Sequence, residues 1–491
     1  MNAKIIRYGL PAAAVLAVYL NSFQGAFQFD DYNVIVDNPG VHSFSAWFSG
    51  LFTGIRPLLK LTYALNWISG WGVFGFHLFN VSVHAANAVL IYLLSREFLG
   101  QYPAARTKDE WKRSGHSRFS GPERDRIRPP ALQPHAGNAP FPEFAALTAA
   151  LLFALHPIQT EAVTYLSGRS MSLMAFFYLG SMLAYVRGAE RGRKLLLYAL
   201  SPVLFAAAVA VKETAVTLPF ALVLWEASSP AANSWKSVAR RQLAHWGTLA
   251  ILALFLLIHP SYSSLLFISL DERSVADNLL SQINGVSYLL SRLVWINRLN
   301  IDPVLAVAHE WTPLLAAEAA CLLALLLTGI AGVRKRPWLG FGLLWFFLQI
   351  LPTNSVIPRL DLANERHLYL AGWGIMLALS GEIMRLQASG ALNPRAVRVA
   401  VMAALLILGS FTAMRNHVYH SEVSLWEDTV EKSPDNARAH NNLGFAYFHS
   451  GRSTEALAEY RQALRLRPGY ERAEKNLAAL MHETEQNSVS P

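Results

Sequence analysis

The sequence predicts an all-α fold, in which a polytopic bundle of membrane-spanning helices precedes a short helical repeat module. Apolar residues make up 53% of the 491 residues and charged residues only 15%, whereas a soluble domain usually has about 25% charged residues. Long apolar segments recur through residues 1–420, and the composition becomes that of a soluble protein after Met414. Near the C-terminus, small and aromatic residues follow the spacing of a tetratricopeptide repeat.

Apolar segments of up to about 20 residues, the length that a helix needs to cross a membrane, recur through the chain. They predict about eleven spans. We expect the first to be a retained anchor rather than a cleaved signal peptide, because many spans follow it and no clear cleavage site is present. The predicted spans are Tyr8–Phe23, Phe76–Leu94, Phe144–Leu155, Met171–Val186, Leu195–Val211, Ala215–Trp225, Trp246–Ile258, Pro313–Val333, Trp338–Leu351, Leu368–Met384 and Val397–Met414.

Basic residues cluster in short segments between these spans, so the net charge of +9 predicts membrane orientation rather than nucleic-acid binding. If Lys4 and Arg7 are cytoplasmic, the basic loops between the spans all lie in the cytoplasm, as the positive-inside rule requires. This holds only if the amphipathic segment Leu279–Ile296 does not form one further crossing of the membrane. The N-terminus is then inside and the C-terminus outside. Residues 101–142, rich in Arg, Pro, Gly and Ser, are expected to form a disordered cytoplasmic linker, with binding to anionic lipid headgroups as the alternative.

The C-terminal residues 421–491 are predicted to form the repeat module. Residues Ala437–Tyr470 match one complete 34-residue repeat, with Gly451 at the turn between its two helices. Leu425–Asp435 resembles the second helix of a preceding repeat, and Glu471–Met481 the first helix of a following one. Because fewer than three repeats rarely stand alone, we expect the module to pack on the membrane domain or on a partner. The residues that carry the repeat pattern are Leu443, Gly444, Tyr447, Ala456, Tyr460, Ala463 and Pro468.

The conspicuous polar motifs all fall in loops that this orientation places outside, where costly polar residues near the membrane are functional candidates. The first loop contains Asp30 and Asp31, directly after the first span. A carboxylate here can act as general base or orient an acceptor hydroxyl. Neighbouring residues point different ways, so we expect one to do chemistry and the other to position it. A helix cap or turn is the alternative.

The other outward motifs supply both carboxylates and cations. His156 and Glu161 precede Arg169 in the second loop; His156 fits a helix terminus better than a catalytic group, and Glu161 with Arg169 equally fits a surface ion pair. Lys212 can bind phosphate or snorkel to water. Cations with carboxylates are what transfer from a lipid-linked sugar phosphate requires. The remaining members are Glu213, Glu365, Arg366 and the outward cation Arg56.

Metal and nucleotide sites are not predicted. The single Cys321 lies in an apolar segment and excludes a disulfide framework. His77 and His84 lack an i,i+4 ligand pair or converging carboxylates, and no glycine-rich phosphate loop occurs in a suitable context. We therefore expect no metal and no cofactor other than the lipid-linked sugar as co-substrate.

Taken in order, these motifs resemble those of the TMTC membrane O-mannosyltransferases and their bacterial relatives, which have a GT-C fold. The resemblance covers nearly the whole chain except residues 101–142, and the repeats follow the last span as in that family. The matching stretches are FQFDDYNVIVDNP, IRPLLKLTYALNW, FHLFNVSVHAANAVL, LLFALHPIQTEAVTYLSGR, VKETAV and LPTNSVIPRLDLANERHLYL.

The resemblance implies transfer of a mannose-like hexose from a polyprenyl phosphate to an acceptor hydroxyl on the outer face, with inversion. Asp31, preferred over Asp30, would be the base; Lys212, Arg169, Arg366 and Arg56 would hold the donor phosphate. Glu161, Glu213, Glu365 and His156 would orient the site or the acceptor. The short repeat tail differs from the long arrays of eukaryotic members. It points to a bacterial inner-membrane protein whose protein or envelope acceptor is engaged through the module.

Three other functions compete with this hypothesis. An oligosaccharyltransferase or O-antigen ligase would be expected to have one large outward loop late in the chain, which this sequence lacks. A transporter predicts two similar halves and charges near the midplane, and the charges here lie at one face. A non-catalytic scaffold, whose repeats recruit envelope proteins, differs from the enzyme in tolerating the loss of Asp31.

Overall fold

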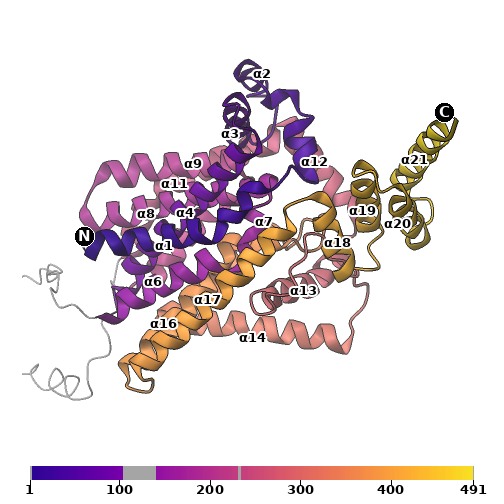
Figure 1. Ribbon diagram of the computed structural model, residues 1–491. Coiled ribbons are helices and arrows are strands. Elements are labelled where there is room, and N and C mark those ends of the chain that lie inside the picture. The colour runs from indigo at the N-terminus through magenta and orange to yellow at the C-terminus, as the bar shows by residue number, and fades with distance from the viewer. Residues whose placement is uncertain (1–2, 103–139, 231–233, 490–491) are drawn as a thin grey trace, which may run out of the picture.

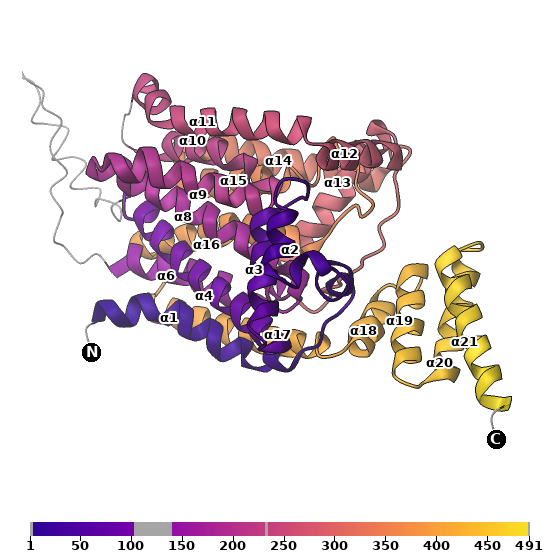
Figure 2. The same cartoon turned by 90° about the horizontal axis from the view of Figure 1, so that it is seen from above.

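The computed structural model describes residues 3–102, 140–230 and 234–489, and every regular element in these ranges is a helix. Long helices lie side by side along one direction, with the N-terminal end of α1 at one end of the bundle and α18–α21 beyond the other (Figure 1, Figure 2). The long helices are α1 (Ala3–Tyr19), α4 (Gly72–Leu99), α6 (Pro140–Leu155), α8 (Arg169–Arg191), α9 (Ser201–Val211), α10 (Leu218–Ser228), α11 (Trp235–Ile258), α14 (Pro313–Lys335), α15 (Pro337–Ile350), α16 (Leu368–Ala388) and α17 (Pro394–Val418). The all-α prediction is confirmed.

The centre of the bundle is a layer of tightly packed helices, in which α4 packs on α1, α6 and α8, and α16 packs on α6 and α15. Glycines bring α15 and α16 into backbone contact. A Cβ added to Gly342 would lie 2.2 Å from the Gly374 carbonyl oxygen, and one added to Gly374 would lie 2.4 Å from the Gly342 oxygen. Trp345 and Trp373 fill the space beside this crossing, with ring centroids 4.7 Å apart. Small residues at helix crossings are typical of membrane bundles.

Among the described residues, four helices are long and apolar enough to cross a membrane: α4, α11, α14 and α17. The bent pair Phe141–Leu155 and Pro157–Val163, with a 53° angle between its parts, is a fifth candidate. Helices α11, α14 and α17 bury little of their apolar surface, as helices facing lipid do. These numbers do not confirm the predicted eleven spans. Each predicted segment does lie on a helix, but several, such as the 14-residue α15, are short for a complete span.

Further helices cover one end of the bundle, where they connect the helices given above (Figure 1). They are α2 (Phe44–Ser49), α3 (Pro57–Ile68), α7 (Thr160–Val163), α12 (Pro260–Glu272) and α13 (Val275–Arg292). The sequence analysis did not predict α2, α3 or α12, because none of them is a long apolar segment. Helix α13 corresponds to the amphipathic segment at 279–296. Its polar residues Asn278, Ser281 and Gln282 are buried, whereas Leu279 is exposed, so its polar face packs against the protein.

The C-terminal module consists of α18 (Glu422–Lys432), α19 (Ala437–His449), α20 (Ser453–Leu466) and α21 (Glu471–Val489). Gly451, at the predicted turn, has a φ of +75°, which favours glycine. A Cβ at Gly444 would lie 2.8 Å from the Tyr460 ring, so the two helices of the repeat pack closely. The predicted disordered linker lies mostly outside the described residues; within it, 140–142 belong to α6.

Candidate active site

The acidic loop that follows α1 lies at the same end of the bundle as the repeat module. Its backbone takes an unusual form at Phe29, whose φ is +50°. Arg56 has a φ of +53°, and these two are the non-glycine residues with positive φ among the described parts of the chain. Such backbone costs free energy and concentrates at functional sites. Phe29 precedes the two aspartates, and Arg56 belongs to the group of cations described below.

Asp31 is held from three directions. Its Oδ1 accepts hydrogen bonds from the Ser167 backbone N–H at 2.7 Å and the Ser167 hydroxyl at 2.5 Å, and its Oδ2 accepts one from the Gln28 N–H at 3.0 Å. The residue is 1% exposed. Burial raises the pKa of the Asp31 carboxyl to about 7, although the bonds from Ser167 and Gln28 lower it. Asp31 begins a helical turn without capping it, so the interpretation as a capping acid is not supported.

Asp30 is more open. It is partly exposed, and no hydrogen bond or ion pair of its carboxylate is found in the described part of the chain. Its backbone N–H donates to Tyr165 Oη at 3.1 Å. The charge of Asp30 acts on Arg366, whose guanidinium it stabilises. The two aspartates therefore have different surroundings, as expected for neighbouring residues.

Four cations lie near one another on the other side of the site: Arg56, Lys212, Arg359 and Arg366. Arg56 makes a two-pronged ion pair with Glu213, with distances of 3.0 Å from Nε and 2.7 Å from Nη2. Burial raises the pKa of Glu213, but the Arg56 charge and hydrogen bond outweigh it and lower that pKa to about 2. Glu213 is thus the fixed counter-ion of Arg56.

Lys212 has no such counter-ion. It is 4% exposed, at the end of α9, and no hydrogen bond or ion pair of its ammonium is found among residues 3–102, 140–230 and 234–489. Burial, followed by repulsion from Arg56 and Arg366, holds the Lys212 pKa well below its usual range. The low exposure of the whole residue fits a snorkelling lysine poorly, and phosphate binding by Lys212 stays a prediction. A buried cation without a partner is costly, and an anionic ligand would relieve that cost.

Arg366 connects the cations to the second predicted loop. Its backbone N–H donates to Glu161 Oε2 at 2.8 Å, and its Nη1 lies 3.5 Å from Glu161 Oε1. The alternative of a surface ion pair between Glu161 and Arg169 is not found, since Glu161 is buried and pairs with Arg366. Glu365 points elsewhere: its Oε1 accepts from Tyr288 Oη at 2.8 Å and from the Asn300 N–H at 2.9 Å.

Tyr63 on α3 joins the two sides of the site. It is 2% exposed, and burial raises the pKa of its phenol. Arg169, whose guanidinium carbon lies 5.0 Å from the Tyr63 ring centroid, lowers that pKa; Asp31 raises it further, and Arg56 and Arg366 lower it. Asp31, Arg56, Arg366 and Arg169 therefore all lie within electrostatic reach of one phenol.

Arg169 and His156 are engaged within the protein. The Arg169 side chain is 0% exposed, and its three nitrogens donate to Asn80 Oδ1, to Thr62 and to the Phe76 carbonyl. His156 Nδ1 accepts from the Ile158 N–H at 3.1 Å, which leaves Nε2 to donate to the Leu293 carbonyl at 3.1 Å. This is the helix-terminus role that the sequence favoured. Phosphate binding by Arg169 stays a prediction.

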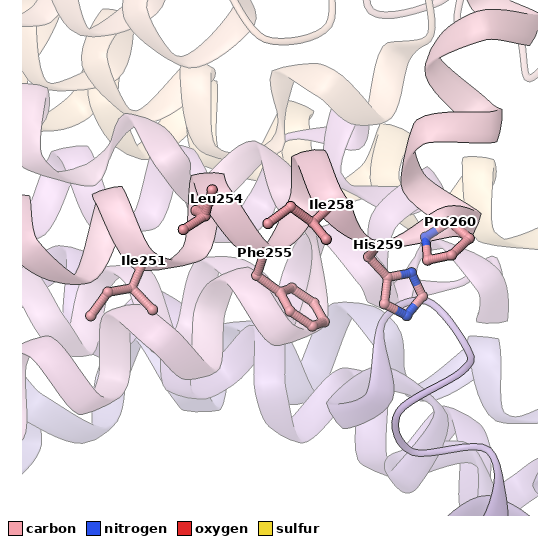
Figure 3. Close-up of a pocket in the computed structure, with 6 residues that line it drawn as sticks. All are labelled: Ile251, Leu254, Phe255, Ile258, His259 and Pro260. Carbon is pink, nitrogen blue, oxygen red and sulfur yellow. The ribbon is translucent and has the colours of Figure 1, made fainter.

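An apolar groove adjoins the cations at the junction of α11 and α12 (Figure 3). His259 Nε2 at the groove lies 3.0 Å from the Phe52 carbonyl oxygen, and Tyr262 Oη on α12 accepts from the Arg56 N–H at 3.1 Å. The groove has a volume of about 390 Å³ and is lined by Ile251, Leu254, Phe255, Ile258, His259 and Pro260.

Sequence reasoning missed several residues that form the site. Arg359 lies within the quoted stretch ending in ANERHLYL, and Ser167 lies two residues before Arg169, so both were inside recognised motifs. Tyr63 carried no signal beyond its place in a matching stretch. In the described part of the chain, no group of three or more His, Cys, Asp or Glu side chains is placed to hold a metal ion.

Comparisons with known proteins support the resemblance seen in the motifs. A tetratricopeptide repeat model matches residues 437–470. Protein O-mannosyl-transferase Tmtc3 of Drosophila melanogaster is 27% identical, in an alignment covering 92% of this chain and 54% of the relative. The TMTC1 protein of Homo sapiens is 24% identical, covering 96% and 57%, and the TMTC4 protein of Mus musculus is 25% identical, covering 91% and 64%.

The chain is thus similar to the TMTC protein O-mannosyl-transferases. The predicted resemblance and the predicted repeat are confirmed. The chain spans between about half and two thirds of the length of the curated relatives named here. No solved structure matches it.

Proposed function

We propose that the protein is an inverting membrane glycosyltransferase that moves a mannose-like hexose from a polyprenyl phosphate to an acceptor hydroxyl. The observation that carries the proposal is the pairing, in one site, of an open carboxylate with a cluster of cations in which the buried Lys212 has no anionic partner among the described residues. Asp30 and Lys212 are the clearest members of the two groups. The similarity to proteins named O-mannosyl-transferases supports the same class of reaction.

The reaction balances with these groups alone. A carboxylate takes the proton of the acceptor hydroxyl, whose oxygen forms a bond to the anomeric carbon. The bond from that carbon to the phosphate oxygen breaks, and the polyprenyl phosphate leaves with its electron pair. One displacement inverts the anomeric carbon, so the base and the leaving phosphate must lie on opposite sides of the sugar. The cations stabilise the charge on the leaving phosphate.

We assign the contact with the acceptor to Asp30 and a supporting role to Asp31. This differs from the preference that the sequence suggested. Three hydrogen bonds occupy the Asp31 carboxylate, which is buried, whereas Asp30 is partly exposed and within electrostatic reach of Arg366. A pKa of about 7 would suit Asp31 to proton transfer, and it remains the competing base.

We assign the donor phosphate to Lys212, Arg359 and Arg366, with Arg56 set in place by Glu213. The apolar groove at the junction of α11 and α12 is suited to the first part of the polyprenyl chain, since Ile251, Leu254 and Ile258 line it and Tyr262 on α12 accepts a hydrogen bond from the Arg56 N–H (Figure 3). Arg169 contributes a fixed positive charge beneath the site through its bonds to Asn80 and Thr62. Because these cations can neutralise the phosphate, we propose a reaction that needs no metal.

The GT-C arrangement of about eleven spans, with the N-terminus inside and the site outside, is part of this proposal. Helices α8, α14 and α16 carry basic residues in their last turns, away from the end at which the module lies (Figure 1). The positive-inside rule places those turns in the cytoplasm. In a bacterial inner membrane, the site and the module would then face the periplasm, where a protein or envelope acceptor would meet them.

A radiochemical assay tests the proposal. The purified protein in detergent is given polyprenyl-phosphate-[³H]mannose, and release of sugar is measured with and without envelope extract as acceptor. We expect release by the wild type and loss in Asp30→Asn, with Asp37→Asn as the matched control, since Asp37 is an exposed acid in the same loop. Chelation should leave the rate unchanged. No release with mannose or other sugar donors would favour the non-catalytic scaffold.

An oligosaccharide donor in the same assay distinguishes the proposed transfer of a single hexose from the other enzyme activity considered above. Release of a preassembled oligosaccharide, with no release of a single hexose, would favour a ligase or oligosaccharyltransferase-like activity. The proposal expects the reverse, because the described site offers its cations to one buried phosphate.

A further inference from the structure

The strained residue before the aspartates is held by the repeat module rather than by the bundle. Phe29, with its φ of +50°, donates its backbone N–H to Glu422 Oε1 at 3.1 Å. Glu422 is the first residue of α18. One turn further along α18, the Trp426 ring packs edge-on against the Phe29 ring, with centroids 5.1 Å apart and an interplanar angle of 83°. A left-handed backbone at a bulky residue persists only when its surroundings enforce it.

The neighbouring residue is tied to the same region. Gln28 Nε2 donates to the Tyr419 carbonyl at 2.5 Å, just before α18 begins. The Gln28 backbone N–H in turn donates to Asp31 Oδ2. The chain direction at Phe29 affects where both carboxylates point. The contacts of Phe29 with Glu422 and Trp426 act on that direction from the module, while Tyr165 and Ser167 hold the aspartates from the bundle.

Helix α18 is itself firmly attached to the membrane domain. Asp428 accepts from Arg415 at 2.5 Å and from Lys432 at 2.6 Å, and Lys432 also donates to the Leu299 carbonyl at 2.8 Å. At the start of α19, Arg438 forms ion pairs with Asp302 and Asp361. These contacts hold the module in one orientation, so α18 can act as a rigid support.

We propose that α18 is a positioning element for the acidic loop, in which Glu422 and Trp426 hold Phe29 in its left-handed conformation and thereby aim Asp30 at the acceptor. The expected change in kcat rests on the proposed function. The expected loosening of the acidic loop does not depend on any activity. The module is then part of the active site's support and not only a surface for partners. Glu422 and Trp426 are positioning residues, because neither is placed to touch the reacting atoms.

Four variants test the role of α18. Glu422→Ala removes the acceptor of the Phe29 N–H, and we expect kcat to fall by about 10-fold to 100-fold with the donor KM unchanged. Glu422→Gln keeps an acceptor oxygen and should retain most of the activity. Glu431→Ala is the matched control, because Glu431 is an exposed acid on the same helix. Adding Phe29→Gly to Glu422→Ala should recover part of kcat, since glycine adopts positive φ without strain.

Hydrogen exchange provides the readout that needs no activity. In Glu422→Ala, we expect faster exchange of the amides of residues 28–32, with unchanged exchange in α19 and α20. Unchanged exchange in the acidic loop would overturn the proposal, as would a lower thermal midpoint with normal kcat. If the wild type shows no transfer at all, the proposed function fails, and the exchange result alone then decides whether α18 supports the loop.

Discussion

The two sides of the candidate site are built in opposite ways. On the acidic side, the Asp31 carboxylate is saturated with hydrogen bonds and the backbone at Phe29 is held from the module. On the basic side, Arg56 has Glu213 as its counter-ion, but Lys212 is buried and makes no hydrogen bond or ion pair among the described residues. Asp31 therefore has its bonding partners within the protein, whereas Lys212 has none among the described residues. We propose that the acidic side is preorganised and that the donor phosphate supplies the anionic partner of Lys212.

The largest expected effect separates the two aspartates. Asp30→Asn should lower turnover by about 10²-fold to 10⁴-fold, the range for loss of a general base, and leave the thermal midpoint unchanged. Asp31→Asn should lower both, because an amide nitrogen cannot accept the bonds that Gln28 and Ser167 donate. Turnover and thermal unfolding of the two variants are the measurements. If Asp30→Asn keeps full turnover while Asp31→Asn loses it, Asp31 is the base.

The next effect concerns the unpaired cation. Lys212→Met should raise the donor KM by about 10-fold to 100-fold, as expected when a charge-assisted contact to phosphate is lost. The thermal midpoint should stay the same or rise, because the variant removes a buried charge that Arg56 and Arg366 repel. Steady-state kinetics and differential scanning fluorimetry check both parts. A clear loss of stability with unchanged KM would show that Lys212 has a structural role.

Arg169 should behave in the opposite way to Lys212. Arg169→Met leaves Asn80 Oδ1 and the Phe76 carbonyl without their donor, so we expect a loss of about 1–3 kcal/mol in the free energy of unfolding. The donor KM of the folded fraction should change little. Chemical unfolding in detergent, with kinetics at a permissive temperature, makes this comparison. A rise in the donor KM without a loss of stability would instead indicate that Arg169 binds the donor phosphate.

The smallest expected effect is on the pH dependence of stability. Asp31 and Glu365 each have a pKa raised to about 7 by burial, from 3.8 and 4.5 respectively. The folded protein then binds more protons than the unfolded chain between about pH 4 and pH 7, so their contribution to stability falls as pH rises through that window. Glu213, with its pKa lowered to about 2, contributes stability above pH 4.5 that is lost as pH falls toward 2.

Thermal midpoints between pH 5 and pH 8 check this dependence. We expect Asp31→Asn to flatten the decline relative to the wild type, while the exposed control Asp37→Asn leaves it in place. An identical slope in Asp31→Asn and the wild type would contradict the raised pKa of Asp31.

The sequence predicted the helices of the bundle and the repeat from patterns that are local in the chain. It also selected Asp30, Asp31, Lys212 and Arg366, because charged residues beside apolar segments are conspicuous. It could not distinguish Lys212 from Arg169, since both are cations beside an apolar segment. The two cations differ in their hydrogen-bond partners. Arg169 bonds to residues on α3 and α4, whereas Lys212 has no such partner among the described residues.

The support of the acidic loop could not be predicted for a similar reason. The bonds of Gln28 to Tyr419 and of Phe29 to Glu422 join residues 391 and 393 positions apart. Phe29 itself carries no sign of a left-handed backbone, because that conformation is normally associated with glycine or asparagine. Only the folded chain places the start of the repeat module against the first outward loop.

Binding of polyprenyl phosphate, the product without its sugar, tests the division of the site most directly. A ligand that binds only the folded state raises the thermal midpoint, and the increase grows with the logarithm of the ligand concentration divided by Kd. We predict that polyprenyl phosphate stabilises the wild type and Asp30→Asn equally and has little effect on Lys212→Met. Equal stabilisation of Lys212→Met, or none of the wild type when a non-phosphorylated polyprenol is the control, would contradict the account.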